Sequence, residues 1–152
     1  MASGFIHQYP VRVEPHLTDY AGVVWHGSYL RWLEEARIDA LRQHGMEYAD
    51  LVALGCDLPV IKMELNYCRS LRMGDRALVR SYILRRDKIR MIWSQNVYFL
   101  NDDQKTPGKV ALEAKVTLIP LDMASKKIMR RLPEEFENIL KELKISDQNS
   151  DQ

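Results

Sequence analysis

One short segment of the sequence brings together an acid, an imidazole and the predicted start of a helix. Asp19 precedes a turn that begins at Gly22, and the chain then passes through His26 into an amphipathic stretch. The first N–H groups of a helix lack intrahelical partners and carry the positive end of its dipole, so they stabilise an oxygen that gains negative charge. A carboxylate beside them can attack a carbonyl carbon or activate a water molecule that does so. The segment therefore predicts chemistry at a carbonyl group, with the oxyanion facing the helix amides.

The helices that must position this segment can be predicted from the spacing of apolar residues. Residues 28–44 carry apolar side chains three and four positions apart, which is typical of a helix with one buried face. Ser28 is its expected N-cap, and Gly45 lies just beyond its end. A short helical turn is expected over residues 48–54. A terminal helix is expected over residues 133–143, because it begins at a proline suited to a first helical turn.

Alternating apolar and polar residues predict a set of strands after the long helix, with one strand before it. The expected strands lie near residues 5–13, 61–68, 77–85, 89–100 and 109–119. The short links at 86–88 and 101–108 are typical of hairpins, which makes the sheet antiparallel. One long helix followed by such strands is buried only if the sheet curls around it. The sequence therefore predicts an α+β fold in which a curved antiparallel sheet of about five to six strands wraps a long central helix.

Length and composition limit the kinds of protein that this chain can be. Its 152 residues are expected to form one domain over residues 1–145, followed by a polar tail over residues 146–152. The 22 basic and 21 acidic side chains nearly balance and 46% of residues are hydrophobic, as in a soluble globular protein. This balance argues against a nucleic-acid partner. Because no stretch approaches the ~18 apolar residues of a membrane span and no secretory signal pattern opens the chain, we expect a cytoplasmic protein.

The cysteines and histidines do not form a recognisable metal-binding pattern. Cys56 and Cys68 are the only cysteines, and neither belongs to a Cys-x-x-Cys or Cys/His array. We expect both to be small, partly buried residues. The four histidines are too scattered for a site evident from the sequence, so no metal is predicted.

The segment from Leu17 to Arg37 closely resembles the hot-dog-fold acyl-CoA thioesterases of the 4-hydroxybenzoyl-CoA thioesterase type, including the Tol-Pal-associated group. The matching residues are Thr18, Asp19, Gly22, Val23, Val24, Trp25, His26 and Tyr29. A second match consists of Tyr67 and the pair Gly74-Asp75, with Ser70 where members often have proline. Leu17 stands where many members have an acid.

This resemblance implies hydrolysis of a coenzyme A thioester to free acid and CoA, without a cofactor. Asp19 would be the nucleophile or the general base, a choice that the sequence leaves open. His26 would act through its backbone N–H as oxyanion donor and through its side chain on the substrate. Val24, Trp25 and Tyr29 would line the substrate pocket. The family also implies a homodimer or homotetramer with active sites at the subunit interface, and an acyl group that is aromatic, such as hydroxybenzoyl or 1,4-dihydroxy-2-naphthoyl, or short to medium aliphatic.

The densest basic cluster comprises Arg85, Arg86, Lys88 and Arg90. It is either a solvated hairpin tip or a set of charges that holds the phosphates of coenzyme A, for which arginine geometry is well suited. On the long helix, Glu34 matches a position that carries an acid near the site in related enzymes. We expect Arg37 to be the structural partner of such an acid.

Two other functions are compatible with the same fold. One is a non-hydrolytic acyl-CoA-binding module, against which the retained Asp19 argues. The other is a hot-dog dehydratase or hydratase of acyl thioesters, which uses a different arrangement of histidine and acid. Fold alone does not separate these functions, whereas an assay of thiol release does.

Overall fold

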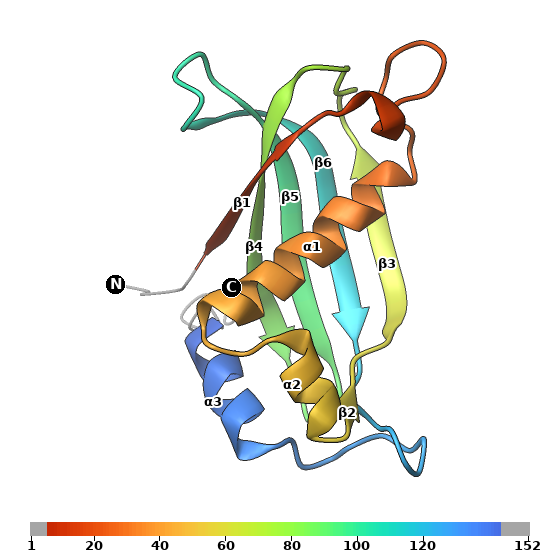
Figure 1. Ribbon diagram of the computed structural model, residues 1–152, viewed down its shortest axis with the longest axis vertical. Helices are drawn as coiled ribbons and strands as arrows, with labels where there is room; N and C mark the ends of the chain where they lie inside the picture. Colours follow the sequence, from red (N-terminus) through yellow and green to blue (C-terminus); the bar gives the residue numbers. More distant parts are fainter. Residues whose placement is uncertain (1–5, 144–152) are drawn as a thin grey trace, which may run out of the picture.

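The computed structural model describes residues 6–143, and in it one long helix lies across a face of a five-stranded antiparallel sheet (Figure 1). The strands, in their order across the sheet, are β1 (His7–Arg12), β4 (Arg76–Arg86), β5 (Met91–Leu100), β6 (Pro107–Leu118) and β3 (Val60–Tyr67). The first and last residues of each strand lie within two residues of the predicted ones. The predicted α+β hot-dog architecture is confirmed. This order leaves β1 and β3 as the two edges of the sheet.

The central helix α1 (Ser28–Gln43) owes its position to an apolar face that packs on the sheet. Leu33, Ala36 and Ala40 are completely buried along this face, at the spacing of three and four that the sequence predicts. Small alanines let the helix approach the strands closely. The helix ends at His44, where Gly45 takes a left-handed φ of 88° that suits a residue without a side chain.

Shorter elements close the end of the molecule at which α1 terminates (Figure 1). They are α2 (Tyr48–Ala53), the two-stranded sheet of β2 (Cys56–Asp57) and β7 (Leu121–Asp122), and α3 (Glu134–Leu143). A 3-10 helix, η1 (Pro15–Leu17), leads into the Asp19 segment. The sequence does not predict η1, β2 or β7, because two or three residues are too few to show a periodicity.

Several predicted details are wrong, each for a local reason. The N-cap of α1 is Gly27, because the Ser28 hydroxyl donates to the Leu17 carbonyl oxygen at 2.9 Å instead of capping the helix. Strand β5 starts at Met91, two residues late, because Asp87 accepts hydrogen bonds from the Ile89 and Arg90 amides and holds them in the turn. Cys68 is exposed rather than partly buried. The predicted tail at residues 146–152 lies outside the described residues.

A buried amide fastens α1 to the sheet. Gln95 on β5 is fully buried, and its Nε2 donates to the Leu33 carbonyl oxygen and to Ser81 Oγ, each at 2.9 Å. Its Oε1 accepts from Arg37 Nη1 at 2.8 Å. Burial lowers the pKa of Arg37 to about 10, while the charge of Glu34 opposes this shift. The expected carboxylate partner of Arg37 is therefore replaced by an amide, and Glu34 acts on it only through its charge.

Within residues 6–143, no helix has the length and apolar character needed to cross a membrane.

Candidate active site

Asp19 closes the loop in which it lies. Its Oδ1 accepts hydrogen bonds from the Ala21 and Val23 amides at 2.9 and 3.2 Å, and its own amide donates to the Val23 carbonyl oxygen at 2.8 Å. Gly22 makes the bend possible with a left-handed φ of 76°. The side chain of Asp19 is exposed, and all the hydrogen bonds of its carboxylate within the described chain go to Oδ1. Oδ2 is thus available to a substrate or a water molecule.

Backbone hydrogen bonds hold this loop against the start of α1. The Val24 amide donates to the Leu71 carbonyl oxygen at 2.9 Å, and the Trp25 amide donates to the Leu17 carbonyl oxygen at 3.0 Å. Val24 is buried in the core, so the segment is anchored by its side chain as well. These contacts hold the loop that carries Asp19 against the segment that leads into α1.

The peptide groups just before α1 are arranged as hydrogen-bond donors. In the part of the chain that the structure describes, neither the His26 N–H nor the Gly27 N–H bonds to a protein acceptor. The hydroxyl of Tyr67 donates to the His26 carbonyl oxygen at 2.9 Å and so fixes the peptide between these two residues. A Cβ atom on Gly27 would lie 2.1 Å from the ring of Trp25, so only glycine fits without displacing that ring. Two free amides at a helix start are suited to bind an oxyanion.

A hollow of about 210 Å³ lies next to these amides. Tyr29 and Tyr67 form one wall, with their rings edge to face and their centroids 5.6 Å apart. Tyr29 is buried, which raises the pKa of its phenol. The hollow is lined by Val24, His26, Tyr29, Tyr67, Cys68, Arg69 and Ser70. Asp19 is not among these lining residues, and we call this space the Tyr67 hollow.

The structure brings three of the nine predicted site residues into one hollow. Val24, His26 and Tyr29 line the Tyr67 hollow. The ring of Trp25 is tilted against that of His26, with the two centroids 4.7 Å apart; Trp25 is 53% exposed and does not line the hollow. The sequence does not assign Tyr67 to the site, although the family match includes it. Its role depends on a hydrogen bond between residues 41 positions apart, which no local pattern indicates.

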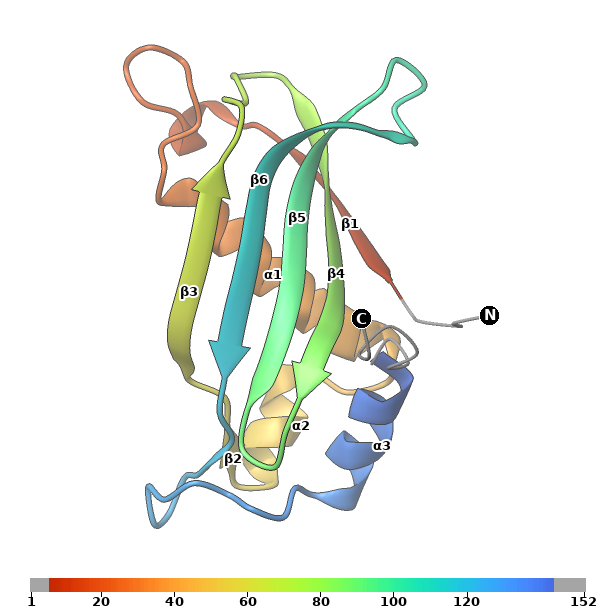
Figure 2. The same cartoon turned by 180° about the vertical axis from the view of Figure 1, so that it is seen from behind.

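The basic hairpin is not brought to Asp19 within one chain. The turn that leads into β4 contacts the Asp19 loop, where the Met73 amide donates to the Gly22 carbonyl oxygen at 2.9 Å. From there β4 runs to the other end of the sheet, about 30 Å away at ~3.3 Å per residue, before it turns into β5 (Figure 2). Arg86 is engaged there, because its Nη1 donates to Glu137 Oε1 on α3 at 2.8 Å and its Nη2 bonds to the second carboxylate oxygen. The other three side chains of the cluster are exposed; they are Arg85, Lys88 and Arg90.

Comparisons with known proteins identify the family to which this chain is similar. Residues 13–140 match the model of the family described as the thioesterase-like superfamily. A candidate esterase of Synechocystis, sll0410, is 47% identical over 123 residues, which cover 81% of this chain and 71% of that protein. The acyl-CoA thioester hydrolase YbgC of Escherichia coli is 27% identical over 131 residues, which cover 86% of this chain and 96% of YbgC.

A solved structure shows the same fold at low sequence identity. The crystal structure of Slr0204, a 1,4-dihydroxy-2-naphthoyl-CoA thioesterase from Synechocystis, superposes with a TM-score of 0.80 at 19% identity. The superposition covers 91% of this chain and 98% of Slr0204. Sequence family and fold thus agree: the chain belongs to the thioesterase-like superfamily, as a thioester hydrolase of the hot-dog-fold acyl-CoA thioesterase group.

Proposed function

We propose that this protein hydrolyses a coenzyme A thioester to the free acid and CoA, with Asp19 as the reacting carboxylate. The observation that carries the proposal is that, within the described chain, Asp19 Oδ2 accepts no hydrogen bond, in the loop that leads to the unpaired N–H groups of His26 and Gly27. A thioester carbonyl bound between them would meet a nucleophile or base on one side and oxyanion donors on the other. Hydrolysis involves no change of oxidation state, and the proposal assigns each step to Asp19, water and the two amides.

Two routes fit this geometry. In the first, Asp19 attacks the carbonyl carbon, the carbon–sulfur bond breaks, CoA leaves as thiolate, and water hydrolyses the resulting anhydride. In the second, Asp19 removes a proton from water, the hydroxide attacks the carbonyl carbon, and the same thiolate leaves. In both routes the negative charge on the carbonyl oxygen faces the His26 and Gly27 amides. After single-turnover hydrolysis in H₂¹⁸O, ¹⁸O in the Asp19 carboxylate would establish the first route, because only that route forms an anhydride in which water can attack the aspartyl carbonyl.

A panel of acyl-CoA substrates assayed for released thiol tests the function. The panel contains hydroxybenzoyl-CoA, 1,4-dihydroxy-2-naphthoyl-CoA and aliphatic acyl-CoA of short and medium length. Thiol release from at least one of them at enzymatic rates is the expected result. Binding of acyl-CoA without thiol release would instead favour a binding module, and hydration of an enoyl-CoA would favour a hydratase.

The basic hairpin is proposed to hold the phosphates of coenzyme A. Because it lies at the far end of the sheet from its own Asp19, it would serve the Asp19 of a second copy. Replacing Arg85, Lys88 and Arg90 with alanine should raise the KM for acyl-CoA about three- to tenfold, since exposed charge pairs contribute only ~1 kcal/mol or less each. The variant should also show a flatter dependence of KM on salt, because screening weakens exposed attraction.

Two controls separate phosphate binding from folding. An acyl-pantetheine substrate lacks the nucleotide, so its KM should be nearly unchanged in the triple variant. Glu137→Gln weakens the ion pair with Arg86 and should lower thermal stability without changing the salt dependence of KM. Equal KM increases on both substrates would assign the hairpin a structural role.

We also propose that the active form is a homodimer or homotetramer. The edge strand β3 has no neighbour on one side and exposes Val60, Ile61 and Tyr67, an arrangement that association would cover. Light scattering should give two or four copies, and specific activity should fall on dilution only where the assembly dissociates. A fully active monomer would contradict a site shared between subunits. The cytoplasmic location expected from the sequence remains part of this proposal.

A further inference from the structure

The peptide group between His26 and Gly27, which we call the 26–27 peptide, lies at the centre of a tight turn that leads into α1. In this turn the Ser28 amide donates to the Trp25 carbonyl oxygen at 2.9 Å. Gly27, at the third position of the turn, has φ −77° and ψ −21°, which are close to the values of a type I turn. A type II turn differs by a rotation of this one peptide, and it needs a positive φ at the third position, which glycine adopts readily. Both turn types are therefore open to this sequence.

The two ends of the turn are held, so the 26–27 peptide can rotate without moving its neighbours. The Trp25 amide and the Ser28 hydroxyl both donate to the Leu17 carbonyl oxygen, at 3.0 and 2.9 Å. The hydrogen bond across the turn, from Ser28 to Trp25, is compatible with type I and type II turns alike. Rotation would therefore exchange the positions of the His26 carbonyl oxygen and the Gly27 N–H, and would leave the loop and the helix in place.

The orientation of the 26–27 peptide decides whether the proposed oxyanion donors can work. In the observed orientation the Gly27 N–H makes no hydrogen bond within the described chain and is open to a substrate oxygen. The C=O and N–H groups of a trans peptide point in opposite directions. After a rotation the His26 carbonyl oxygen would take the place of the N–H, and it would repel an oxygen that gains negative charge. Only one of the two turn types supports hydrolysis.

Packing requires glycine at position 27, and this requirement makes the rotation possible. A Cβ atom at this position would lie 2.1, 2.4 and 2.7 Å from three atoms of the Trp25 ring, which are its nearest neighbours. Any other residue would disfavour the positive φ of a type II turn, but it does not fit beside Trp25 in the observed arrangement. The choice between the two turn types must therefore come from another part of the chain.

The Tyr67 hydroxyl is placed to make that choice. It donates to the His26 carbonyl oxygen at 2.9 Å and is the only donor to this oxygen within the described residues. Tyr67 is the last residue of β3, whose end lies beside the start of α1 (Figure 1). Because a rotated peptide would point its oxygen away from Tyr67, this hydrogen bond exists only in the orientation that offers the Gly27 N–H. The bond also polarises the peptide, which strengthens the N–H as a donor.

The ring of Tyr67 is held in place from the side of the core. It meets the ring of Tyr29 edge to face, with the two centroids 5.6 Å apart. Tyr29 is only 3% exposed, and its ring meets that of Trp32 in the same way at 5.4 Å. A row of three aromatic rings thus connects the buried face of α1 to the 26–27 peptide and gives the Tyr67 hydroxyl a defined position.

We propose that Tyr67 is a positioning residue that holds the 26–27 peptide in the one orientation able to stabilise the oxyanion. The proposal rests on the proposed function and adds a side chain that acts through the backbone rather than on the substrate. The bond changes at the thioester are those of the two routes given above, and Tyr67 keeps its proton in both.

Tyr67→Phe removes the hydroxyl and keeps the ring against Tyr29. It should lower kcat about five- to tenfold and leave the KM for acyl-CoA within about twofold, because an oxyanion donor acts mainly on the transition state. Tyr9→Phe is the matched control, since the Tyr9 hydroxyl donates to Glu35 at 3.2 Å from β1, at the opposite edge of the sheet. This control should keep the wild-type kcat, and circular dichroism checks that both variants are folded. A wild-type kcat in Tyr67→Phe would overturn the proposal.

A rescue experiment separates the orientation of the peptide from a general effect on folding. A Trp25→Ala background removes the half-exposed ring that blocks a side chain at position 27, so Gly27→Ala should be accommodated. Alanine disfavours the positive φ of the rotated peptide. Adding Tyr67→Phe should therefore lower kcat about five- to tenfold in Trp25→Ala, but less than about twofold in Trp25→Ala/Gly27→Ala. Each ratio is taken within one background. Equal losses in both backgrounds would show that the hydroxyl does not act through this peptide.

Nuclear magnetic resonance reads the orientation of the peptide without any turnover. The chain has only seven glycines, so selective ¹⁵N-glycine labelling gives few amide signals. Rotation turns the Gly27 N–H toward the Hα of His26, so the nuclear Overhauser effect between these two protons should be stronger in Tyr67→Phe than in the wild type and in Tyr9→Phe. An unchanged effect in Tyr67→Phe would contradict the proposal. A wild-type protein that releases no thiol would defeat the proposed function, whereas this spectrum would still decide whether Tyr67 sets the orientation.

Discussion

Replacing Asp19 with asparagine should lower the turnover number at least about 100-fold while the protein remains folded, because a neutral amide neither attacks a carbonyl nor accepts a proton. The structure explains why folding should survive. Asp19 Oδ1 accepts hydrogen bonds from the Ala21 and Val23 amides, and the Oδ1 of asparagine can accept the same two bonds. The loss should therefore appear in kcat, with the KM for acyl-CoA and the melting temperature close to those of the wild type.

Asp103 provides a matched control for this substitution. Its Oδ1 accepts from the Lys105 and Thr106 amides, at 2.8 and 2.9 Å, in the exposed β5–β6 hairpin, so it has the same turn-forming role as Asp19 without the adjacent helix N-terminus. Asp103→Asn should leave kcat unchanged. Wild-type turnover by Asp19→Asn would remove the central claim that this carboxylate reacts.

Replacing Gln95 with leucine should destabilise the protein by about 3 kcal/mol, because the buried guanidinium of Arg37 would lose its acceptor. Leucine fills a similar volume, so the loss would come from hydrogen bonds rather than from a cavity. The Leu33 carbonyl oxygen and Ser81 Oγ would lose a donor at the same time. Urea denaturation should show a lower midpoint with an unchanged m-value, since the same surface is exposed on unfolding.

Asn96 is the matched control for Gln95 on the same strand. It is half-buried, and its side chain makes only long hydrogen bonds, with Tyr98 at 3.4 Å and with the Ala114 amide at 3.3 Å. Asn96→Leu should cost less than about 1 kcal/mol. If Gln95→Leu were as stable as the wild type, Gln95 would not fasten α1 to the sheet, and the position of the Asp19 loop would depend on apolar packing alone.

The sequence by itself determined the parts of this protein whose signals are local. The bounds of α1 followed from apolar residues three and four apart, and the strands followed from alternation, because these periods are properties of the backbone. The position of Asp19 in the loop that precedes α1 was also readable, since loop and helix are adjacent in the chain. Val24, His26 and Tyr29, which lie close together in the sequence, line one hollow in the structure.

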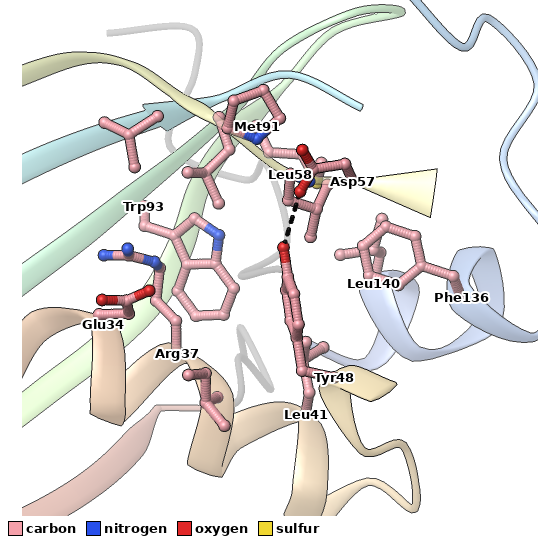
Figure 3. Close-up of a pocket in the computed structure, with 14 residues that line it drawn as sticks. Glu34, Arg37, Leu41, Tyr48, Asp57, Leu58, Met91, Trp93, Phe136 and Leu140 are labelled. Carbon is pink, nitrogen blue, oxygen red and sulfur yellow. Dashed lines mark hydrogen bonds between the residues drawn. The ribbon is translucent and has the colours of Figure 1, made fainter. Parts of the chain in front are cut away.

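Only the tertiary structure decided the contacts between distant residues. Arg37 bonds to Gln95 across 58 positions, Tyr67 to the His26 carbonyl across 41, and Arg86 to Glu137 across 51. Strand register and the packing of helices on the sheet set these pairs, and neither leaves a periodic trace in the sequence. The cavity lined by Trp93, Tyr48 and Phe136 (Figure 3) is of the same kind, because its walls come from three helices and from strands that meet only when the chain is folded.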